Sequence, residues 1–136
     1  MAQTLKLEIV TPAAKTYSDD VEMVTLPGIE GEMGIFPMHV PLLTQIVAGE
    51  VGVRKDGQES FFAVGDGFAE ITGDHVAILT DMAVRGDDID ERKAEEARQR
   101  AEARLQEKLT DEETALVSAA LADSLAQLKV KRRHRR

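Results

Sequence analysis

Residues 79–102 read LTDMAVRGDDIDERKAEEARQRAE, and the sequence changes its structural period within this stretch. Before Gly86, apolar residues alternate with polar ones or come in short bursts between turn signals, as in half-buried strands. After Gly86, apolar residues recur about every fourth position, which is the spacing of a helix, and glycine and proline are absent to the end of the chain. The sequence therefore predicts a β domain at residues 1–85 and a helical hairpin at residues 86–136.

The first part is predicted to consist of short strands. Near its start, apolar Leu5, Leu7 and Ile9 alternate with polar neighbours, so one face of this segment is apolar and the other is polar. Further on, Asp56 and Gly57 stand between two apolar runs, and this dipeptide readily supplies the positive φ angles of a tight hairpin turn. Strands at such short spacing favour a β-sandwich or flattened barrel.

Capping signals divide the second part into two helices. Asp88, with Glu91 three residues later, is the predicted cap of the first helix, and the pattern at residues 110–113, TDEE, is a second capping box. The predicted apolar stripes are Ala94, Ala97, Ala101, Leu105 and Leu109 in the first helix, and Val117, Leu121, Leu125 and Leu128, with Ala119, Ala122 and Ala126 nearby, in the second. Two helices joined by a short turn should lie antiparallel.

The apolar stripe of the hairpin is rich in alanine, and this limits how firmly the hairpin can be held. A buried methyl group contributes about 0.8 kcal/mol, whereas ordering one backbone residue costs about 1–2 kcal/mol. We therefore expect a marginal hairpin that can leave the β domain when a partner offers a better surface.

Charge is unevenly distributed along the 136 residues. The formal net charge is -8, which argues against general affinity for nucleic acid, yet residues 129–136, KVKRRHRR, contain no acidic residue. The chain has no cysteine, which excludes disulfides and thiolate metal sites. No apolar run approaches the roughly 18 residues that span a bilayer, and the N-terminus lacks a signal-peptide pattern, so no direct membrane insertion is expected.

A search for catalytic and metal-binding patterns finds none. His39, His75 and His134 are scattered, without metal-ligand spacing, and no serine stands beside a base and an orienting acid in a known order. The glycines of residues 27–34, PGIEGEMG, are interpreted as turn glycines, because no lysine or serine of a phosphate loop follows them. The acidic residues at 87–90 lack the pattern of a calcium loop and are interpreted as a helix N-terminal cluster. We therefore predict that the chain is not an enzyme and has no metal site.

A basic row remains as a candidate surface for partners. Arg100, Arg104 and Lys108 stand four residues apart on the predicted first helix. They form either a solvated face neutralised by Glu96 and Glu107, or, together with the basic tail, a surface that meets an acidic partner.

Two blocks resemble a known family. Residues 30–43, EGEMGIFPMHVPLL, closely resemble the signature E-G-x-[LM]-G-[IV]-x-P-x-H-x-P-L-[LV] of the epsilon subunit of F-type ATP synthases. The stretch at 79–102 resembles that family's join between β-sandwich and C-terminal hairpin. The order of elements also fits, so the resemblance covers essentially the whole chain.

The resemblance implies a non-catalytic subunit of the central stalk of a proton- or sodium-translocating ATP synthase. Such a subunit binds the gamma subunit, sits on the c-ring and couples both to the catalytic head. It implies that Glu32 and His39 face the polar loops of the c-ring, although His39 is equally well explained as a corner histidine that bonds local backbone. It also implies that the hairpin either folds against the sandwich or extends along gamma to the alpha and beta subunits, where it restrains ATP hydrolysis.

Some members of the family bind regulatory ATP at the hairpin through a pattern resembling [IL]-D-x-x-R-A. The matching positions here are Ile89, Asp90, Lys93 and Arg100. Lysine replaces the arginine of the pattern, and two further arginine positions of strong binders are Asp123 and Gln127. Lysine lacks the planar fork that holds phosphate bidentately, and aspartate repels phosphate. We expect weak ATP binding or none, and no required cofactor.

The resemblance also implies a location, on the cytoplasmic face of a bacterial inner membrane as a peripheral protein. A missing transit peptide favours a bacterial source, although an organelle-encoded chain would lack one too. The alternative function is an unrelated β-sandwich adaptor that uses its helical hairpin to bind a partner.

Overall fold

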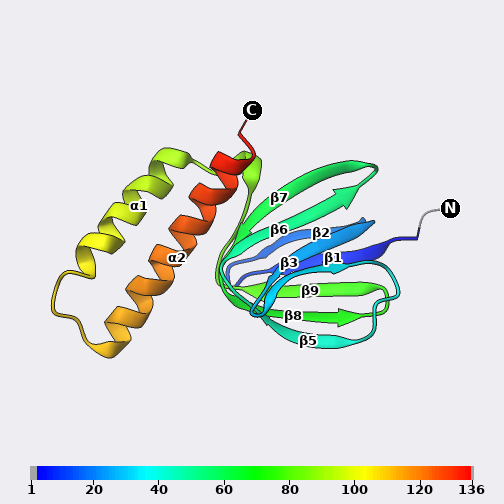
Figure 1. The fold of residues 1–136 in the computed structure, drawn as a ribbon, viewed down its shortest axis with the longest axis horizontal. Helices are drawn as coiled ribbons and strands as arrows, with labels where there is room; N and C mark the ends of the chain where they lie inside the picture. The colour runs from blue at the N-terminus through cyan, green and yellow to red at the C-terminus, as the bar shows by residue number, and fades with distance from the viewer. Residues whose placement is uncertain (1–2, 136) are drawn as a thin grey trace.

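All ten strands precede the two α-helices in the computed structural model, which describes residues 3–135 (Figure 1). The strands are β1 (Leu5–Val10), β2 (Lys15–Val21), β3 (Met23–Gly28), β4 (Gly31–Ile35), β5 (Leu42–Ile46), β6 (Gly49–Lys55), β7 (Gln58–Val64), β8 (Gly67–Thr72), β9 (His75–Thr80) and β10 (Ala83–Arg85). The helices are the 3-10 turn η1 (Gly86–Asp88), α1 (Glu91–Arg104) and α2 (Asp111–Arg133). The predicted fold class, a β-sandwich or flattened barrel followed by an antiparallel helical hairpin, is confirmed.

One folded sheet forms the sandwich. Its strand order is β10-β7-β6-β3-β5-β8-β9-β1-β2, with β4 paired to β3 outside this path. Neighbouring strands are antiparallel except β1 and β9, which pair in parallel from opposite ends of the domain. Such a pairing leaves no local turn signal, so the sequence did not predict it.

The sandwich core is built entirely from strand residues. Its buried side chains include Leu7, Ile46, Phe62 and Ile78, and no member of this cluster comes from the hairpin. The apolar alternation seen in the sequence is what fills this core, because successive strand residues point to opposite faces. The sandwich therefore has a core of its own.

The backbone angles confirm one turn that the sequence predicts, and they confirm a second only in part. Asp56 and Gly57 have φ angles of 53° and 75°, as expected for the tight turn between β6 and β7. Among the glycines of residues 27–34, only Gly31 has a positive φ, at 128°. Gly28 and Gly31 flank the turn between β3 and β4, whereas Gly34 lies inside β4, so its interpretation as a turn glycine is wrong. At Gly28 a side chain would collide with the backbone oxygen of Gly31, 2.7 Å away.

The first helix begins later and ends earlier than predicted. Asp90, not Asp88, is its N-cap, because Asp88 is taken up by η1 and the Asp90 carboxylate accepts a bond from the Lys93 N–H at 3.1 Å. The helix ends at Arg104, so Leu105 lies beyond it. The second capping box is confirmed: Thr110 and Glu113 exchange side-chain and backbone bonds, both of 3.1 Å.

Helix α2 lies between α1 and the sandwich and buries residues on two sides (Figure 1). Ala126 and Val130 belong to a cluster with sandwich residues, whereas Ser124 and Leu128 lie on the opposite side of the helix, where α1 packs. The predicted single stripe was therefore wrong at Leu125, which is 47% exposed. Within residues 3–135, neither helix is long and apolar enough to cross a membrane.

Candidate functional site

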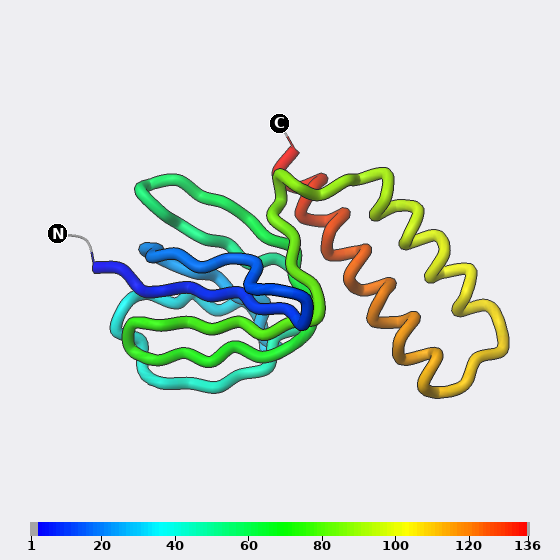
Figure 2. The backbone as a smooth tube through the Cα atoms, turned by 180° about the vertical axis from the view of Figure 1, so that it is seen from behind, coloured from blue at the N-terminus to red at the C-terminus, as the bar shows by residue number. Residues whose placement is uncertain are grey.

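The contact between α2 and the sandwich is the first feature of the candidate site. A second, small cluster of buried residues lies there, separate from the sandwich core, and Figure 2 shows α2 against the sandwich with α1 on its outer side. Its buried members are Ala63, Ile89, Ala126 and Val130, with Ala48, Phe61, Met82 and Val84 half-buried around them. We call these eight residues the docking seam.

The docking seam is small and rich in alanine. Only Ala126 and Val130 contribute buried side chains from α2. A buried methyl group is worth about 0.8 kcal/mol and a fully buried valine about 1.5–3 kcal/mol, so the apolar contribution of α2 amounts to a few kcal/mol. A partner surface of ordinary size could replace such a contact. Detachment of the hairpin stays a prediction.

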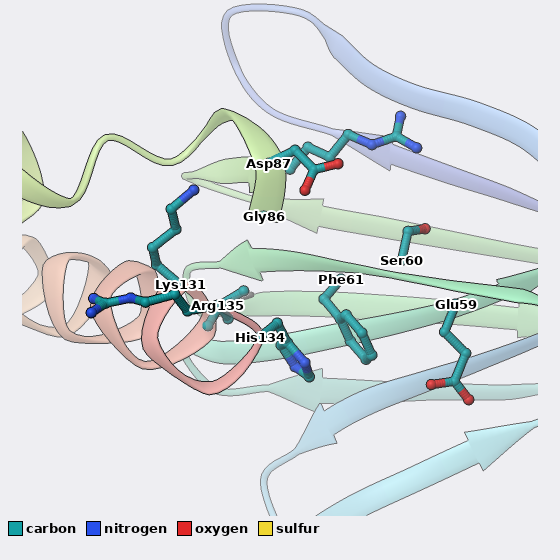
Figure 3. Close-up of a pocket in the computed structure, with 10 residues that line it drawn as sticks. Glu59, Ser60, Phe61, Gly86, Asp87, Lys131, His134 and Arg135 are labelled. Carbon is teal, nitrogen blue, oxygen red and sulfur yellow. The ribbon is translucent and has the colours of Figure 1, made fainter.

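The C-terminal end of α2 is tied to the sandwich by polar contacts. Glu50 of β6 accepts a bond from the Nε2–H of His134 at 2.6 Å and pairs with the Nη1 of Arg133 at 3.4 Å. The imidazole of His134 also stacks on the ring of Phe61, with centroids 3.5 Å apart (Figure 3). The side chain of Glu50 is only 17% exposed, so these contacts are partly shielded from solvent.

The same tail is also tied to α1. Arg132 pairs with Glu91 at 3.1 Å and with Glu95 at 3.4 Å, and Arg135 pairs with Glu91 as well. Hydrogen bonding to Arg132, supported by Arg135, holds the pKa of Glu91 below its ordinary value. The pairs of Glu91 with Arg132 and Arg135 stabilise the contact between the tail and α1. This stabilisation is complete at pH values above the ordinary pKa of a glutamate, and it is lost as the pH falls through the lowered pKa of Glu91.

Three arginines of the basic tail are therefore paired inside the molecule in this arrangement. Arg132, Arg133 and Arg135 bond carboxylates of α1 and β6, while Arg136 lies outside the described residues. The sequence did not reveal these pairs, because their partners are 37 to 83 positions away.

The predicted basic row does not lie on one helix. Arg100 is on α1, Arg104 ends it, and Lys108 follows in the connection to α2. Arg104 pairs with Glu107 at 3.8 Å and with Glu113 at 3.5 Å. Among residues 3–135, neither Arg100 nor Lys108 forms an ion pair, and both are exposed.

Glu96, the other predicted neutralising residue, pairs with Arg92 at 4.0 Å. Of the two predicted neutralising residues, Glu107 pairs with a member of the row, Arg104. Glu96 pairs with Arg92, which is not a member of the row.

The four residues of the predicted ATP pattern lie just before α1 and along it. Ile89 is buried in the docking seam, and Asp90 caps the helix. Lys93 and Arg100 are exposed, seven residues apart and therefore about two turns along the same side of the helix. On α2, Asp123 faces the sandwich, because its carboxylate oxygen lies over Gly65 of the connection between β7 and β8.

The predicted c-ring residues lie in and after β4. Glu32 is exposed on β4. The half-buried His39 lies in the connection to β5, and its Nδ1 bonds the carbonyl oxygen of Val40 at 2.6 Å. The local backbone bond of the alternative interpretation is therefore present. It leaves the predicted contact with a c-ring untested.

The same connection contains exposed apolar side chains, which sequence periodicity did not reveal. Phe36 is 56% exposed, Met38 73% and Val40 71%. A second exposed pair, Phe68 and Leu79, lies cross-strand on β8 and β9. Gathered apolar side chains on the surface mark sites of protein contact.

A group of three carboxyl side chains under α2 was also missed. Asp123 of α2 faces Asp81, in the connection between β9 and β10, and Asp66, in the connection between β7 and β8. Burial, followed by the Asp81 carboxyl and the charge of Asp66, raises the pKa of Asp123 to about 7. The only sequence signal for this group is one acidic residue among the small and apolar residues of α2.

A pocket of about 540 Å³ opens beside the docking seam (Figure 3). Its wall carries both signs of charge, with Glu59 and Asp87 among the acidic residues and Lys131 among the basic ones. The side chain of Ser60 points away from His134 in Figure 3. Within residues 3–135, no group of histidine, aspartate and glutamate residues is arranged to hold a metal ion.

Comparison with family models covers almost the whole chain. Residues 4–86 match the β-sandwich domain of the ATP synthase delta/epsilon chain. Residues 87–132 match the long α-helix domain of the same chain.

Two curated relatives are similar over nearly their full length. The chain is 44% identical over 128 residues to the ATP synthase epsilon chain of Laribacter hongkongensis (strain HLHK9), covering 93% of this chain and 91% of the relative. It is 42% identical over 134 residues to the ATP synthase epsilon chain of Polynucleobacter necessarius subsp. necessarius (strain STIR1), covering 98% and 97%.

Solved structures share the fold. A chain in the cryo-EM structure of the Euglena gracilis mitochondrial ATP synthase, containing OSCP, F1 and the c-ring, superposes with a TM-score of 0.74 at 24% identity, covering 95% of this chain and 81% of that one. A chain in the central stalk and c-ring structure of the Tetrahymena thermophila mitochondrial ATP synthase gives a TM-score of 0.65 at 13% identity, covering 95% and 97%.

The contacts of Glu50 predict how the tail holds the hairpin. Changing Glu50 to Gln removes the charge that His134 and Arg133 face, which we expect to weaken docking by about 1 kcal/mol and to raise the open population roughly fivefold. Trypsin cleavage within the hairpin, measured under native conditions, should accelerate by the same factor, because cleavage requires opening. Glu59→Gln is the matched control. Glu59 pairs with Arg54, another residue of the sandwich domain, so this change removes a charge without removing an ion pair to α2. Equal cleavage rates in both variants would contradict the assignment.

Proposed function

This chain belongs to the ATP synthase delta/epsilon chain family, and we propose that it is the non-catalytic epsilon subunit in the central stalk of an F-type ATP synthase. In this role it couples the gamma subunit and the c-ring to the catalytic head during proton or sodium translocation. The names of the two curated relatives and the coverage of both domains support the proposal. The chemistry then belongs to neighbouring subunits.

The sandwich is the anchoring part in this proposal. Its exposed apolar side chains at Phe36, Met38 and Val40 suit burial against a partner protein. Glu32 and His39 lie on the same stretch of chain and are proposed to meet the polar loops of the c-ring. The gamma subunit is proposed to bind this domain as well.

The hairpin is the regulatory part, and one observation carries this assignment: the sandwich core contains no hairpin residue. The hairpin can therefore leave the docking seam without opening that core. We propose that it extends along gamma to the alpha and beta subunits and restrains ATP hydrolysis there. The seam's small apolar area supports this step, because the docked state is weakly held.

Extension would expose the basic side chains that docking now neutralises. Arg133 and His134 would lose Glu50. Together with the basic row, Arg133 would present positive charge to an acidic surface of the catalytic head. Complementary charge of this kind directs a partner to one docking position.

Regulatory ATP is proposed to bind weakly or not at all. Asp90 already uses its carboxylate to cap α1, and Lys93 stands where the family pattern has arginine. Asp123 faces the sandwich and would repel phosphate. The chain is proposed to be a peripheral protein on the cytoplasmic face of a bacterial inner membrane, attached through its partners.

Removal of the hairpin tests the regulatory role. We expect a chain truncated after Arg85 to bind gamma as the full chain does, and the assembled enzyme to hydrolyse ATP several-fold faster, because nothing then obstructs rotation. The measurement is ATP hydrolysis by the reconstituted enzyme, with gamma co-purification as the control for assembly. Unchanged hydrolysis with intact gamma binding would refute the inhibitory role, and loss of gamma binding by both chains would favour the adaptor function.

Charge reversal tests the basic row. Changing Arg100, Arg104 and Lys108 together to glutamate should lessen inhibition in the reconstituted enzyme, because the row would then repel an acidic surface. The control places three glutamates at Lys6, Arg54 and Lys55 of the sandwich, which alters net charge equally. Inhibition that is identical in both variants would mean that the row is merely solvated.

A further inference from the structure

Two carboxyl groups meet where α2 docks on the sandwich. A side chain placed on Gly65 would find the Oδ1 of Asp81 at 1.8 Å and the Oδ1 of Asp123 at 2.7 Å. The two oxygens therefore lie no farther apart than the sum of these distances. Asp81 belongs to the sandwich and Asp123 to the hairpin, so the pair bridges the docking interface.

Gly65 makes room for this pair. It is buried between β7 and β8, its N–H donates to the carbonyl of Met82 at 2.9 Å, and any side chain here would collide with both carboxyl groups. The backbone angle does not require glycine here, because the φ of Gly65 is not in the left-handed region. Glycine is needed because the two carboxyl groups occupy the space that a side chain would fill. The backbone is thus arranged to let Asp81 and Asp123 approach each other.

The groups that face Asp123 from the sandwich are acidic or neutral. Asp66 adds a third negative charge from the connection between β7 and β8. The hydroxyl of Thr80 lies 3.4 Å from the Oδ1 of Asp81 and donates more closely, at 3.1 Å, to the carbonyl of Asp66. On α2 itself, the neighbours one turn away from Asp123 carry no charge; they are Ala119, Ala120, Ala126 and Gln127.

Among the described residues, no lysine, arginine or histidine forms an ion pair with any of the three carboxyl groups. On α1, Arg98 pairs with Glu95 and Glu102.

Two carboxylates held this close without a cation do not both stay ionised, because like charges repel and burial penalises each charge. When one of them keeps a proton, it donates a hydrogen bond to the other, and the pair becomes an attractive contact. The raised pKa of Asp123, with burial as its largest cause, agrees with this arrangement.

We propose that a proton shared between Asp123 of α2 and Asp81 of the sandwich latches the hairpin in its docked position, and that loss of this proton loosens docking. Docking takes up one proton from solvent, and undocking returns it. The latch rests on the docked arrangement and does not depend on the proposed inhibitory role.

The sign of the pH dependence follows from the raised pKa. Below the ordinary aspartate pKa of 3.8, the carboxyl is neutral in both states and the proton's contribution to docking is complete. Between that value and about 7, the docked state holds a proton that the undocked state has released, so docking weakens as the pH rises. One linked proton changes the equilibrium by at most about tenfold per pH unit.

A second contact that includes an ionisable side chain lies at the C-terminal end of α2, between His134 and Glu50. The experiment therefore includes a His134 variant, which distinguishes this contact from the carboxyl pair.

Hydrogen exchange of the α2 amides in the isolated full chain reads the opening equilibrium directly. Between pH 5 and pH 7 we expect the opening constant to rise by up to about tenfold per pH unit, and to level off above pH 7. Asp123→Asn keeps a neutral hydrogen-bond donor at the same place and should abolish this rise. Asp81→Asn tests the same pair from the sandwich side. Asp56→Asn, at the exposed β6–β7 turn, and His134→Gln should both retain the rise.

A flat wild-type profile would overturn the proposal. So would a rise that persists in both Asp123→Asn and Asp81→Asn. A rise that disappears in His134→Gln and survives in Asp123→Asn would assign the pH dependence to the histidine pair, and would overturn the latch as well. Each result comes from the isolated chain, so it is independent of whether the hairpin inhibits ATP hydrolysis.

Discussion

The packing of Ala126 and Val130 of α2 against Ala63 and Ile89 is the interaction on which the arrangement of this molecule depends. It joins a sandwich with a complete core to a hairpin that has little core of its own. The area is small because half of the buried residues in the seam are alanines, and a few kcal/mol is all that such an area provides. The hairpin therefore belongs to the low-stability end of the structure, where elements that move are found.

Polar contacts at the C-terminal end and in the middle of α2 adjust this weak apolar contact. At the C-terminal end, Glu50 faces His134 and Arg133, which favours docking and is weakened by salt. In the middle of α2, about two turns before Val130, Asp123 faces Asp81, which favours docking only while a proton is present. The docked state is thus sensitive to conditions that leave the sandwich core unaffected. A regulatory part that must leave and return to its anchor needs this kind of balance.

Local signals predicted most of the fold. The change of period at Gly86, the turn at Asp56 and the capping box at Thr110 all depend on residues close in sequence, and the structure has each of them. The failures involve longer-range contacts. The first helix starts at Asp90 because η1 occupies the preceding residues, and Leu125 is exposed because α2 divides its buried residues between two neighbours. The partners of the basic tail and of Asp123 come from distant strands, so no spacing in the sequence could identify them.

The central claim is that the hairpin opens as a unit while the sandwich stays folded. Native-state hydrogen exchange at increasing denaturant, followed amide by amide, tests it most directly. The account predicts that α2 amides exchange through an opening with a lower free energy and a smaller denaturant dependence than the amides of β1 and β9, because only the seam is exposed. A single opening free energy with one denaturant dependence for both sets of amides would contradict it.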